Sequence, residues 1–501
     1  VYKGQWRAFR FMNIFEELDE AGEWYIDTNT NKLYLYPLSN STNPEIKMSL
    51  GDFNMVSILG ASHIRFQGLT MTGGKQDCFT ISNADAVVIE NCKMDSFEQR
   101  AASFTDCWNS GVKDSTISYT GRGGILLTGG DADNFVNGNN FVTNNVIHDF
   151  STLQTSYAPA VNLQGFGNRI DHNEIYNTNH QAIQFWGSMH VIEYNIIHDS
   201  CLNAADMGAI YTGRRLQDHG TQIRYNHFYN IGNALARTWF PCCIFIDDGT
   251  SDIEVYGNVF GPGATTTECN KVYRGQLNTF TKNLFIDVPV TFYNAAVQTN
   301  LWREDCVTWA DNLAMVNTNE HYTSRWPWLL ETLDPVNQPE RIEHHGNTFS
   351  ENLVVYVNEK PGSKTVSHGV HWAGYSVKPL ELNTNVTCGQ SADNKSLFAD
   401  FDNGDYTLTQ KAYDLMKGTG FEEIPFREMG TASAFNNPPY VENAQIYGNL
   451  ALSRELRASY DYTDRERDPQ GTSRYRWLVS DTIDGVYNPI PGATATSFTV
   501  T

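Results

Sequence analysis

The stretch Asn173-Glu-Ile-Tyr-Asn177 returns 22 residues later as Asn195-Ile-Ile-His-Asp199. Both copies begin with Asn, carry a bulky apolar residue at the third position and end with Asp or Asn. Further copies begin at Asn145, Asn226 and Asn283, and a partial copy begins at Asn258. Short alternating strand patterns with Gly and Asn turns fill the intervals, without the long helical periodicity of helix repeats. The sequence is therefore a series of strand-rich repeats, 22 to 32 residues long.

A repeat of this size matches one coil of a solenoid built from two or three short strands. Each strand hydrogen-bonds to the strands of the coils above and below it, about 4.8 Å away. Asn suits the turns because it tolerates left-handed backbone angles and bonds to its own backbone. Longer repeats carry loops inserted at a turn. We therefore predict an all-β chain folded as a right-handed parallel β-helix.

The strands of successive coils can be aligned by a Gly at their end, as in 124–129, 160–165, 182–187, 208–213 and 244–249. Alternation along a strand sends neighbouring side chains to opposite faces. The pattern places Val161, Leu163, Ile183 and Phe185 inside, and Asn162, Gln164, Gln184 and Trp186 outside. The stacked strands form one continuous outer face, which long turn loops should flank and on which we expect a ligand to bind.

Three regions are expected along the chain. Residues 1–50 contain a strand–turn–strand pattern and should form a small N-terminal β unit or cap, because open solenoids need their ends covered. Residues 51–435 should form the β-helix, with an aromatic, less regular insertion or lid at 318–345. Residues 436–501 resemble a linker and the truncated start of an immunoglobulin-like module, which suggests a longer, multimodular protein.

The composition restricts the partners. The formal net charge of −22 over 501 residues disfavours nucleic acid and anionic membranes, which need a basic face. No apolar run is long enough to span a membrane, and the chain starts at Val1 as if a leader had been removed. We expect a secreted or cell-wall-associated monomer. No cofactor is indicated, because the nine Cys lack C-x-x-C spacing. Surface Asp and Asn residues could hold a structural calcium ion, but no motif in the sequence supports one.

Three aspartates are the leading catalytic candidates. Asp206 opens the stretch 206–214, and Asp247 and Asp248 close the aligned strand at 244–249. Side chains on adjacent coils lie roughly 5 Å apart, so two carboxyls there cannot ionise independently. Glycoside hydrolysis needs such a pair, one acid and one nucleophile or base. The alternative is that these are ordinary turn and cap residues, although Asp is disfavoured within a strand.

Polar and aromatic residues surround these aspartates in the predicted groove. Amides and imidazoles could bind sugar hydroxyls, indoles could serve as sugar platforms, and arginines could hold a carboxylate or pair with a neighbouring Asp. Each could also fill a structural role at a turn or under a loop. The candidate substrate-binding residues are His180, Gln181, Gln184, Trp186, Tyr211, Arg214, Trp239 and Arg274.

Residues 53–290 resemble bacterial β-helix enzymes that act on carbohydrates, in particular glycoside hydrolase family 141, which contains α-L-fucosidases and xylanases. The resemblance depends on the stretches 157–163, 179–183, 206–214 and 246–249, together with 405–408 and 420–426 nearer the C-terminus. It implies that the catalytic carboxylates are Asp206 and Asp247. The sequence departs from the pattern after Arg214, where Arg215 replaces an acidic or aromatic residue, which puts the sugar contacts there in doubt.

Three functions remain open from the sequence. The leading one is an extracellular glycoside hydrolase that cleaves a glycan or polysaccharide with Asp206 and Asp247. The second is a polysaccharide lyase or epimerase, with His180, Tyr211 and Arg274 supplying the base and the cation; unsaturated products would reveal a lyase. The third is a non-catalytic glycan-binding adhesin, which would keep its function when both aspartates become Asn.

Overall fold

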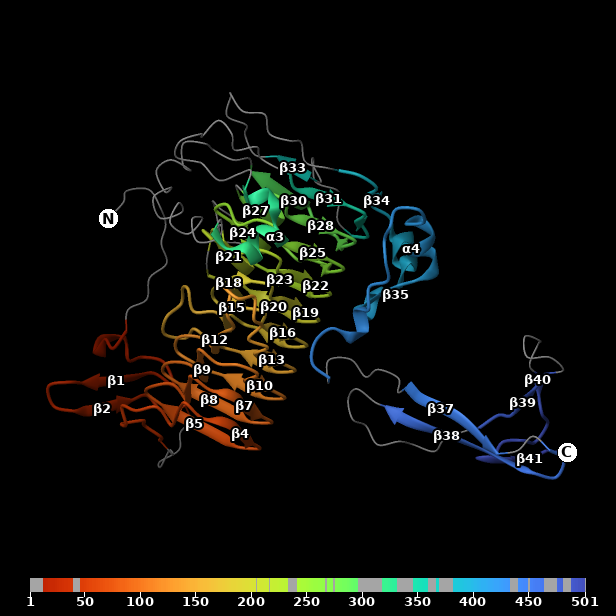
Figure 1. Ribbon diagram of the computed structural model, residues 1–501. Coiled ribbons are helices and arrows are strands. Elements are labelled where there is room, and N and C mark those ends of the chain that lie inside the picture. The colour runs from red at the N-terminus through yellow and green to blue at the C-terminus, as the bar shows by residue number, and fades with distance from the viewer. Residues whose placement is uncertain are drawn as a thin grey trace.

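The computed structural model describes most of the chain. The described residues are 12–38, 46–203, 205–215, 217–232, 241–265, 268–273, 275–295, 318–330, 346–358, 366–368, 382–432, 440–448, 451–463, 475–480 and 488–500. Three long parallel sheets dominate these residues, and the chain passes from sheet 1 to sheet 2 to sheet 3 in each coil (Figure 1). The predicted fold, a right-handed parallel β-helix of the all-β class, is confirmed.

The strands of each sheet are stacked along the solenoid axis. Sheet 1 consists of β3 (Val56–Leu59), β6 (Phe79–Ser82), β9 (Ala102–Thr105), β12 (Ile125–Gly129), β15 (Val161–Phe166), β18 (Ile183–Ser188), β21 (Gly208–Gly213), β24 (Cys242–Asp247), β27 (Glu268–Tyr273), β30 (Val290–Ala295) and β33 (Val366–His368). Sheet 2 consists of β4 (Ser62–Gln67), β7 (Asp85–Glu90), β10 (Gly111–Lys113), β13 (Phe141–Thr143), β16 (Arg169–Asp171), β19 (Val191–Glu193), β22 (Gln222–Arg224), β25 (Glu254–Tyr256), β28 (Thr279–Thr281) and β31 (Thr348–Ser350). Sheet 3 consists of β5 (Thr70–Gly74), β8 (Lys93–Phe97), β11 (Thr116–Ser118), β14 (Val146–His148), β17 (Glu174–Tyr176), β20 (Ile196–Ser200), β23 (His227–Ile231), β26 (Val259–Phe260), β29 (Leu284–Ile286), β32 (Leu353–Val355) and β34 (Val386–Cys388).

The core is a set of apolar columns inside the solenoid. One column follows the register of sheet 2, in which each residue pairs with its equivalent one coil away: Ile89, Val112, Val142, Ile170, Ile192, Ile223, Val255, Phe280 and Phe349. All are buried, and burial of this much apolar surface is the main force that holds the coils together. The predicted inward residues of β15 and β18, such as Leu163 and Phe185, are likewise fully buried.

The repeated Asn at the start of each motif forms a ladder at the turn between sheets 2 and 3. The side-chain oxygen of Asn195 accepts the backbone N–H of Asn173 at 3.0 Å, and its amide donates to the carbonyl of Ile170 at 3.1 Å. The same arrangement recurs through Asn145, Asn173, Asn195, Asn226, Asn258, Asn283, Asn352 and Asn385. The ladder satisfies buried backbone groups that the turns would otherwise leave without partners.

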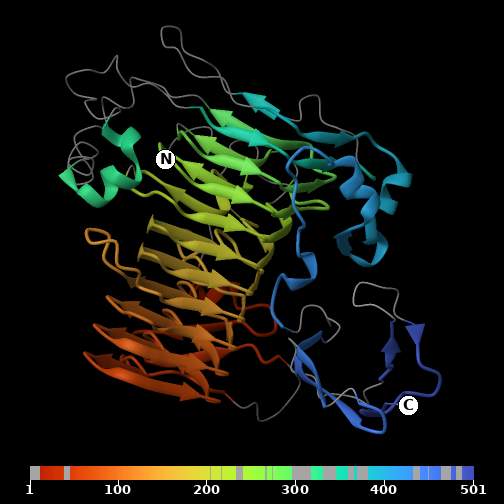
Figure 2. The same cartoon turned by 45° about the vertical axis from the view of Figure 1, so that its right-hand side comes forward.

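Smaller elements lie outside the solenoid. An antiparallel hairpin, β1 (Trp24–Asp27) and β2 (Lys32–Leu35), precedes it. The helix α3 (Glu320–Arg325), with η2 (Pro327–Leu330), packs at the turns between sheets 1 and 2. Residues 392–432, which include η4 (Ala392–Leu397), α4 (Gln410–Leu415) and η6 (Phe426–Glu428), lie beside the stack away from α3, and Phe426 contacts His227 of sheet 3 (Figure 2).

The C-terminal residues form separate antiparallel strands. β37 (Tyr440–Gly448), β38 (Glu455–Thr463) and β41 (Ser497–Thr499) make a three-stranded sheet, and β39 (Leu478–Val479) pairs with β40 (Asn488–Pro489). The antiparallel pairing sets this region apart from the solenoid. Among the described residues, the helices are all too short to reach across a bilayer.

Candidate functional site

The two adjacent aspartates lie where β24 ends on the outer face of sheet 1. Asp247 is the last residue of the strand and pairs in register with Gly213 of β21. The Tyr211 hydroxyl donates to Asp247 Oδ2 at 2.9 Å, and the backbone N–H of Asp248 donates to Asp247 Oδ1 at 2.8 Å. Both oxygens of the Asp247 carboxyl are therefore held, which fixes its orientation.

The surroundings of Asp247 favour its protonated form. Burial raises the pKa of its carboxyl to about 6, the charge of Asp248 adds to the rise, and that of Asp206 contributes a little more. The two hydrogen bonds act in the opposite direction because they stabilise the carboxylate. Asp247 is thus a carboxyl group that keeps its proton to unusually high pH, as a general acid requires.

Asp206 lies two residues before β21 and is not the register partner of Asp247, since Gly213 takes that place. The expected spacing of one coil between these two carboxyls therefore does not follow from strand stacking. The charge of Asp206 nonetheless contributes to the raised pKa of Asp247, so the two carboxyls interact electrostatically. Asp206 keeps solvent contact, yet desolvation by the surrounding protein raises the pKa of its carboxyl, an effect that the nearby ammonium of Lys271 opposes.

Asp248 has a different partner. Arg214 Nε donates to Asp248 Oδ2 at 2.7 Å. The Arg214 side chain is 75% exposed, whereas that of Asp248 is 12% exposed, so the ion pair joins an exposed cation to a largely buried carboxyl group. The ion pair raises the pKa of the Arg214 guanidinium. The charge of Asp248 in turn contributes to the raised pKa of Asp247.

Lys271 is a cation at this site that the sequence analysis missed. The register of sheet 1 aligns Tyr211 with Phe245 and Phe245 with Lys271 on the outer face. Lys271 is buried, and its Nζ lies 5.2 Å from the centre of the Phe245 ring. Alternation within β27 already predicts an outward position for this lysine. Its burial was not foreseen, because a lysine on an outer face is usually solvated.

His180, Gln181 and Gln184 were predicted to bind sugar, but all three side chains are buried. His180 Nδ1 contacts the Gln181 side-chain oxygen and accepts the backbone N–H of Tyr157 at 3.4 Å. Burial lowers the pKa of His180 to about 4, so its imidazole is neutral. These residues offer little surface to a ligand. The exposed Tyr157 ring lies 4.9 Å from the His180 ring, and the predicted site did not include it.

Trp186 is half-exposed on the outer face of β18, as the alternation predicts. The guanidinium of Arg215 lies 5.5 Å from the centre of its ring, so a cation already covers part of the indole. The side chain of Asp218 accepts the N–H of Gly187 at 2.6 Å and steadies the end of the strand. The other two predicted contacts, Trp239 and Arg274, lie outside the described residues.

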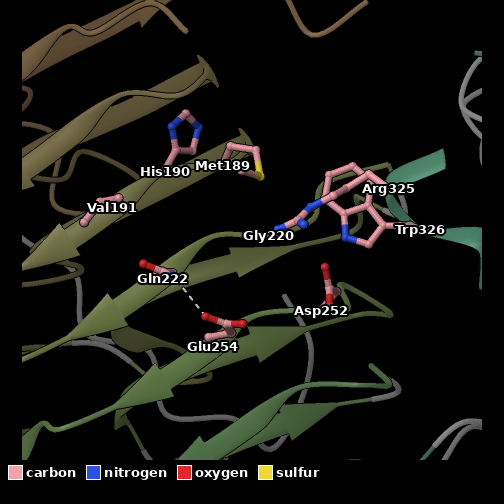
Figure 3. A pocket seen from close by; sticks show the side chains of 9 residues that line it. All are labelled: Met189, His190, Val191, Gly220, Gln222, Asp252, Glu254, Arg325 and Trp326. Atoms are coloured by element: carbon pink, nitrogen blue, oxygen red, sulfur yellow. Dashed lines mark hydrogen bonds between the residues drawn. The ribbon is translucent and has the colours of Figure 1, made fainter. Parts of the chain in front are cut away.

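A separate cavity of 340 Å³ lies at the turns between sheets 1 and 2, under α3 (Figure 3). Trp326 and Arg325 border it on one side, and Asp252, Gln222 and Glu254 on the other. Burial raises the pKa of Asp252 to about 6, while a hydrogen bond from the Trp326 side chain lowers it. None of the predicted site residues lines this cavity. Nothing in the sequence pairs residue 326 with residue 252, so pattern reasoning could not find it.

Metal ligands do not gather anywhere in the described part of the chain: no group of three or more His, Cys, Asp or Glu is arranged to hold an ion. The cysteines that the structure describes are free thiols, and all but Cys388 are buried.

Comparison with known proteins identifies the fold. The family model described as right handed beta helix region matches residues 54–260. None of the curated proteins matches the chain. Among solved structures, a glycoside hydrolase is similar with a TM-score of 0.43 and 14% identity over 55% of this chain and 57% of its own.

Two further solved structures are similar at a comparable level. The catalytic unit of a GH87 α-1,3-glucanase from Streptomyces thermodiastaticus has a TM-score of 0.32 and 11% identity over 48% of this chain and 58% of its own. The alginate lyase AlyF-OU02 has a TM-score of 0.37 and 10% identity over 74% of this chain and 90% of its own. This chain thus spans less than two thirds of the two hydrolases. The match to the family model over residues 54–260 agrees with the three parallel sheets of the structure.

Proposed function

We propose that the protein is a glycoside hydrolase that cleaves a glycan or polysaccharide in a groove on the outer face of the β-helix, beside β21 and β24. Asp247 is the general acid, and Asp206 is the nucleophile or general base. The observation that carries the proposal is the environment of Asp247: a carboxyl on the outer face of sheet 1, fixed at both oxygens, with its pKa raised to about 6.

The environments of the two carboxyls support this division of roles. Glycosidases keep one carboxyl protonated for the leaving oxygen and the other ionised. Burial and the Asp248 charge give Asp247 its raised pKa. Asp206 is more exposed, and Lys271 and Arg214 both favour its ionised form. In the reaction, Asp247 would give its proton to the glycosidic oxygen while Asp206 attacks the sugar or activates water.

A polysaccharide lyase is the second candidate, and the presence of Lys271 and Arg214 beside the carboxyls favours it. A lyase needs cations to neutralise a uronate and a base to remove a proton from the sugar. The predicted bases suit this role poorly. His180 is buried, and the pKa of Tyr211 is raised by burial and by Asp247, to which its hydroxyl donates. Lys271 would have to act as the base instead.

A glycan panel, with neutral polysaccharides and polyuronates, tests both candidates. We expect wild-type protein to release reducing ends from at least one polysaccharide without any absorbance from unsaturated sugars. Asp206→Asn and Asp247→Asn should each lower this rate by about 10²- to 10⁴-fold, the usual contribution of an acid or base. If the wild type instead forms an unsaturated product and Lys271→Met abolishes it, the protein is a lyase and the hydrolase proposal is wrong.

The acidic composition agrees with a protein that works outside the cell, secreted or attached to the cell wall, and we keep that as part of the proposal. Fractionation of the native host, with an antibody against this chain, tests it. Recovery of the protein in the cytoplasmic fraction would contradict the assignment without affecting the proposed chemistry.

A further inference from the structure

Seven consecutive strands of sheet 1 contain no charged residue. They are β3, β6, β9, β12, β15, β18 and β21, and neither their inward nor their outward positions carry Asp, Glu, Lys, Arg or His. Within the described strands of this sheet, acidic and basic side chains begin at Asp247 and continue with Glu268 and Lys271. Along these strands, charged side chains therefore first appear at Asp247, one of the two proposed catalytic carboxyls.

The other two sheets of the same coils differ. Their strands carry charges on most coils, including Glu90 and Lys113 in sheet 2 and Asp95 and Glu174 in sheet 3. A chain with a formal net charge of −22 has many acidic residues to distribute. Their exclusion from one face over seven coils therefore reflects the use of that face and not the composition of the chain.

The uncharged face carries half-exposed polar residues on the strands β12, β15 and β18, which precede β21 and β24 in the stack. Thr128, Asn162, Gln164 and Trp186 are half-exposed on three neighbouring strands, and we call them the polar strip. The register aligns Thr128 with Gln164 and Gln164 with Trp186, so the strip continues from coil to coil. Gln164 Nε2 donates to Asn162 Oδ1 at 2.9 Å, which leaves further amide donors and acceptors at the surface.

The chemistry of this strip suits one kind of polymer. Hydroxyl groups both donate and accept, as amides do, so a neutral sugar can satisfy the strip without leaving a charge unpaired. Each unit of a polyuronate carries a carboxylate, and these strands contain no lysine or arginine to pair with it. Among the arginines beside these strands, Arg122 donates to Gln154 and Arg214 pairs with Asp248. The guanidinium of Arg215 lies over the Trp186 ring.

We infer that the polar strip is a binding lane for an uncharged glycan chain, which runs along the solenoid axis from Asp206 and Asp247 toward β12. The inference rests on the proposed function and names its substrate class, which is neutral polysaccharides. Several sugars of the polymer would lie on the coils that precede the proposed catalytic residues, between β21 and β12. The polymer contacts consecutive strands about 4.8 Å apart, the spacing of the sheet.

Binding to the full-length Asp247→Asn protein tests the lane without turnover. Affinity electrophoresis would compare arabinoxylan, glucomannan and xyloglucan with polygalacturonate and alginate. We expect retardation by at least one neutral polymer, insensitive to salt, and none by the polyuronates. Gln164→Ala should weaken binding about threefold to tenfold, the value of one or two hydrogen bonds. The matched control is Gln67→Ala on the exposed end of β4 in sheet 2, which should leave binding unchanged.

The outcomes separate the lane from the chemistry. Preference for a polyuronate, no binding to any of the three neutral polymers, or equal effects of the two Gln→Ala changes would overturn the lane. Neutral binding that depends on Gln164, together with full hydrolytic activity in Asp247→Asn, would instead overturn the catalytic assignment and leave the lane in place. Thermal unfolding of each variant checks that lost binding is not lost folding.

Discussion

Sheets 1 and 2 are built from the same coils and share the same apolar interior, but their outer faces differ. From β3 to β21, sheet 1 shows the solvent amides, hydroxyls and aromatic rings without a charge. Over the same coils, sheet 2 carries ion pairs such as Lys113–Glu90 and Arg224–Glu193. Folding requires only the inner pattern, so the outer residues are free to serve another purpose.

This contrast between the outer faces indicates which face to examine for function. Charged outer residues keep a solenoid soluble and discourage contacts between faces. A face that gives up these charges over seven coils must be protected or used in another way. In sheet 1 the uncharged strip leads to carboxyls whose pKa values are raised, and perturbed pKa values gather at functional sites. The comparison thus supports the proposed site independently of any relative.

The largest expected effect comes from the charged end of sheet 1. Asp247→Asn removes the proton that the leaving oxygen needs, and we expect hydrolysis to fall by about 10²- to 10⁴-fold. The rate of reducing-end release measures it. The control is Asp95→Asn on sheet 3, where the carboxylate only accepts hydrogen bonds from Ser96 and Ser118. Equal activity of Asp247→Asn and Asp95→Asn would show that the acidic residues of sheet 1 are no more important for hydrolysis than those of sheet 3.

The next effect is on stability and concerns the turn between sheets 2 and 3. Asn195→Ala would leave the buried N–H of Asn173 and the carbonyl of Ile170 without partners. Each buried unpaired group costs about 1–3 kcal/mol, so the free energy of unfolding should fall by roughly 2–5 kcal/mol. Denaturant unfolding measures it, with Gln67→Ala at the exposed end of β4 as the control. A loss below about 1 kcal/mol would mean that the ladder is not needed for stability.

The sequence predicts the parts of this molecule that depend on local pattern. Alternation places Leu163 inside and Gln164 outside, because strand geometry sends successive side chains to opposite faces. The recurrence of Asn fixes the coil and hence the fold. Asp247 is found because an aspartate at the end of a buried strand is unusual.

The remainder depends on turn lengths and long-range packing, which the pattern does not contain. The offset between Asp206 and the register partner of Asp247 follows from the path of the chain before β21. The burial of His180 and of Lys271 depends on neighbours distant in sequence. The contact between Trp326 and Asp252 joins residues more than 70 positions apart.

The pH dependence of hydrolysis tests the role of Asp248. Asp247 must be protonated, so activity should decline as the pH rises through about 6. Asp248→Asn removes a charge that raises the pKa of Asp247, and the decline should then move to lower pH. A pH profile of kcat/KM measures the shift, and a decline that stays in place would exclude Asp247 as the acid.

The same carboxyl affects stability in a defined direction. The folded state holds the Asp247 proton more tightly than the unfolded chain, because the pKa rises from 3.8 to about 6 on folding. Its contribution is fully present below pH about 4 and is lost as the pH rises through about 6. Denaturant unfolding should show this slope in wild type, and Asp247→Asn should remove it. Unchanged slopes would indicate that Asp247 is ionised throughout.

The smallest effect is expected on the charged face of sheet 2. Lys113 Nζ lies 3.0 Å from Glu90 Oε1, and Arg65 lies 3.0 Å from the other oxygen, so Lys113→Met leaves Glu90 with one cation. Ion pairs near the surface contribute at most about 1 kcal/mol, and the long methionine keeps the packing of the lysine stem. The free energy of unfolding should change by less than about 1 kcal/mol and hydrolysis should not change. A larger loss of stability, or any loss of activity, would show that the charges of sheet 2 do more than maintain solubility, and the contrast with sheet 1 would no longer separate a working face from a supporting one.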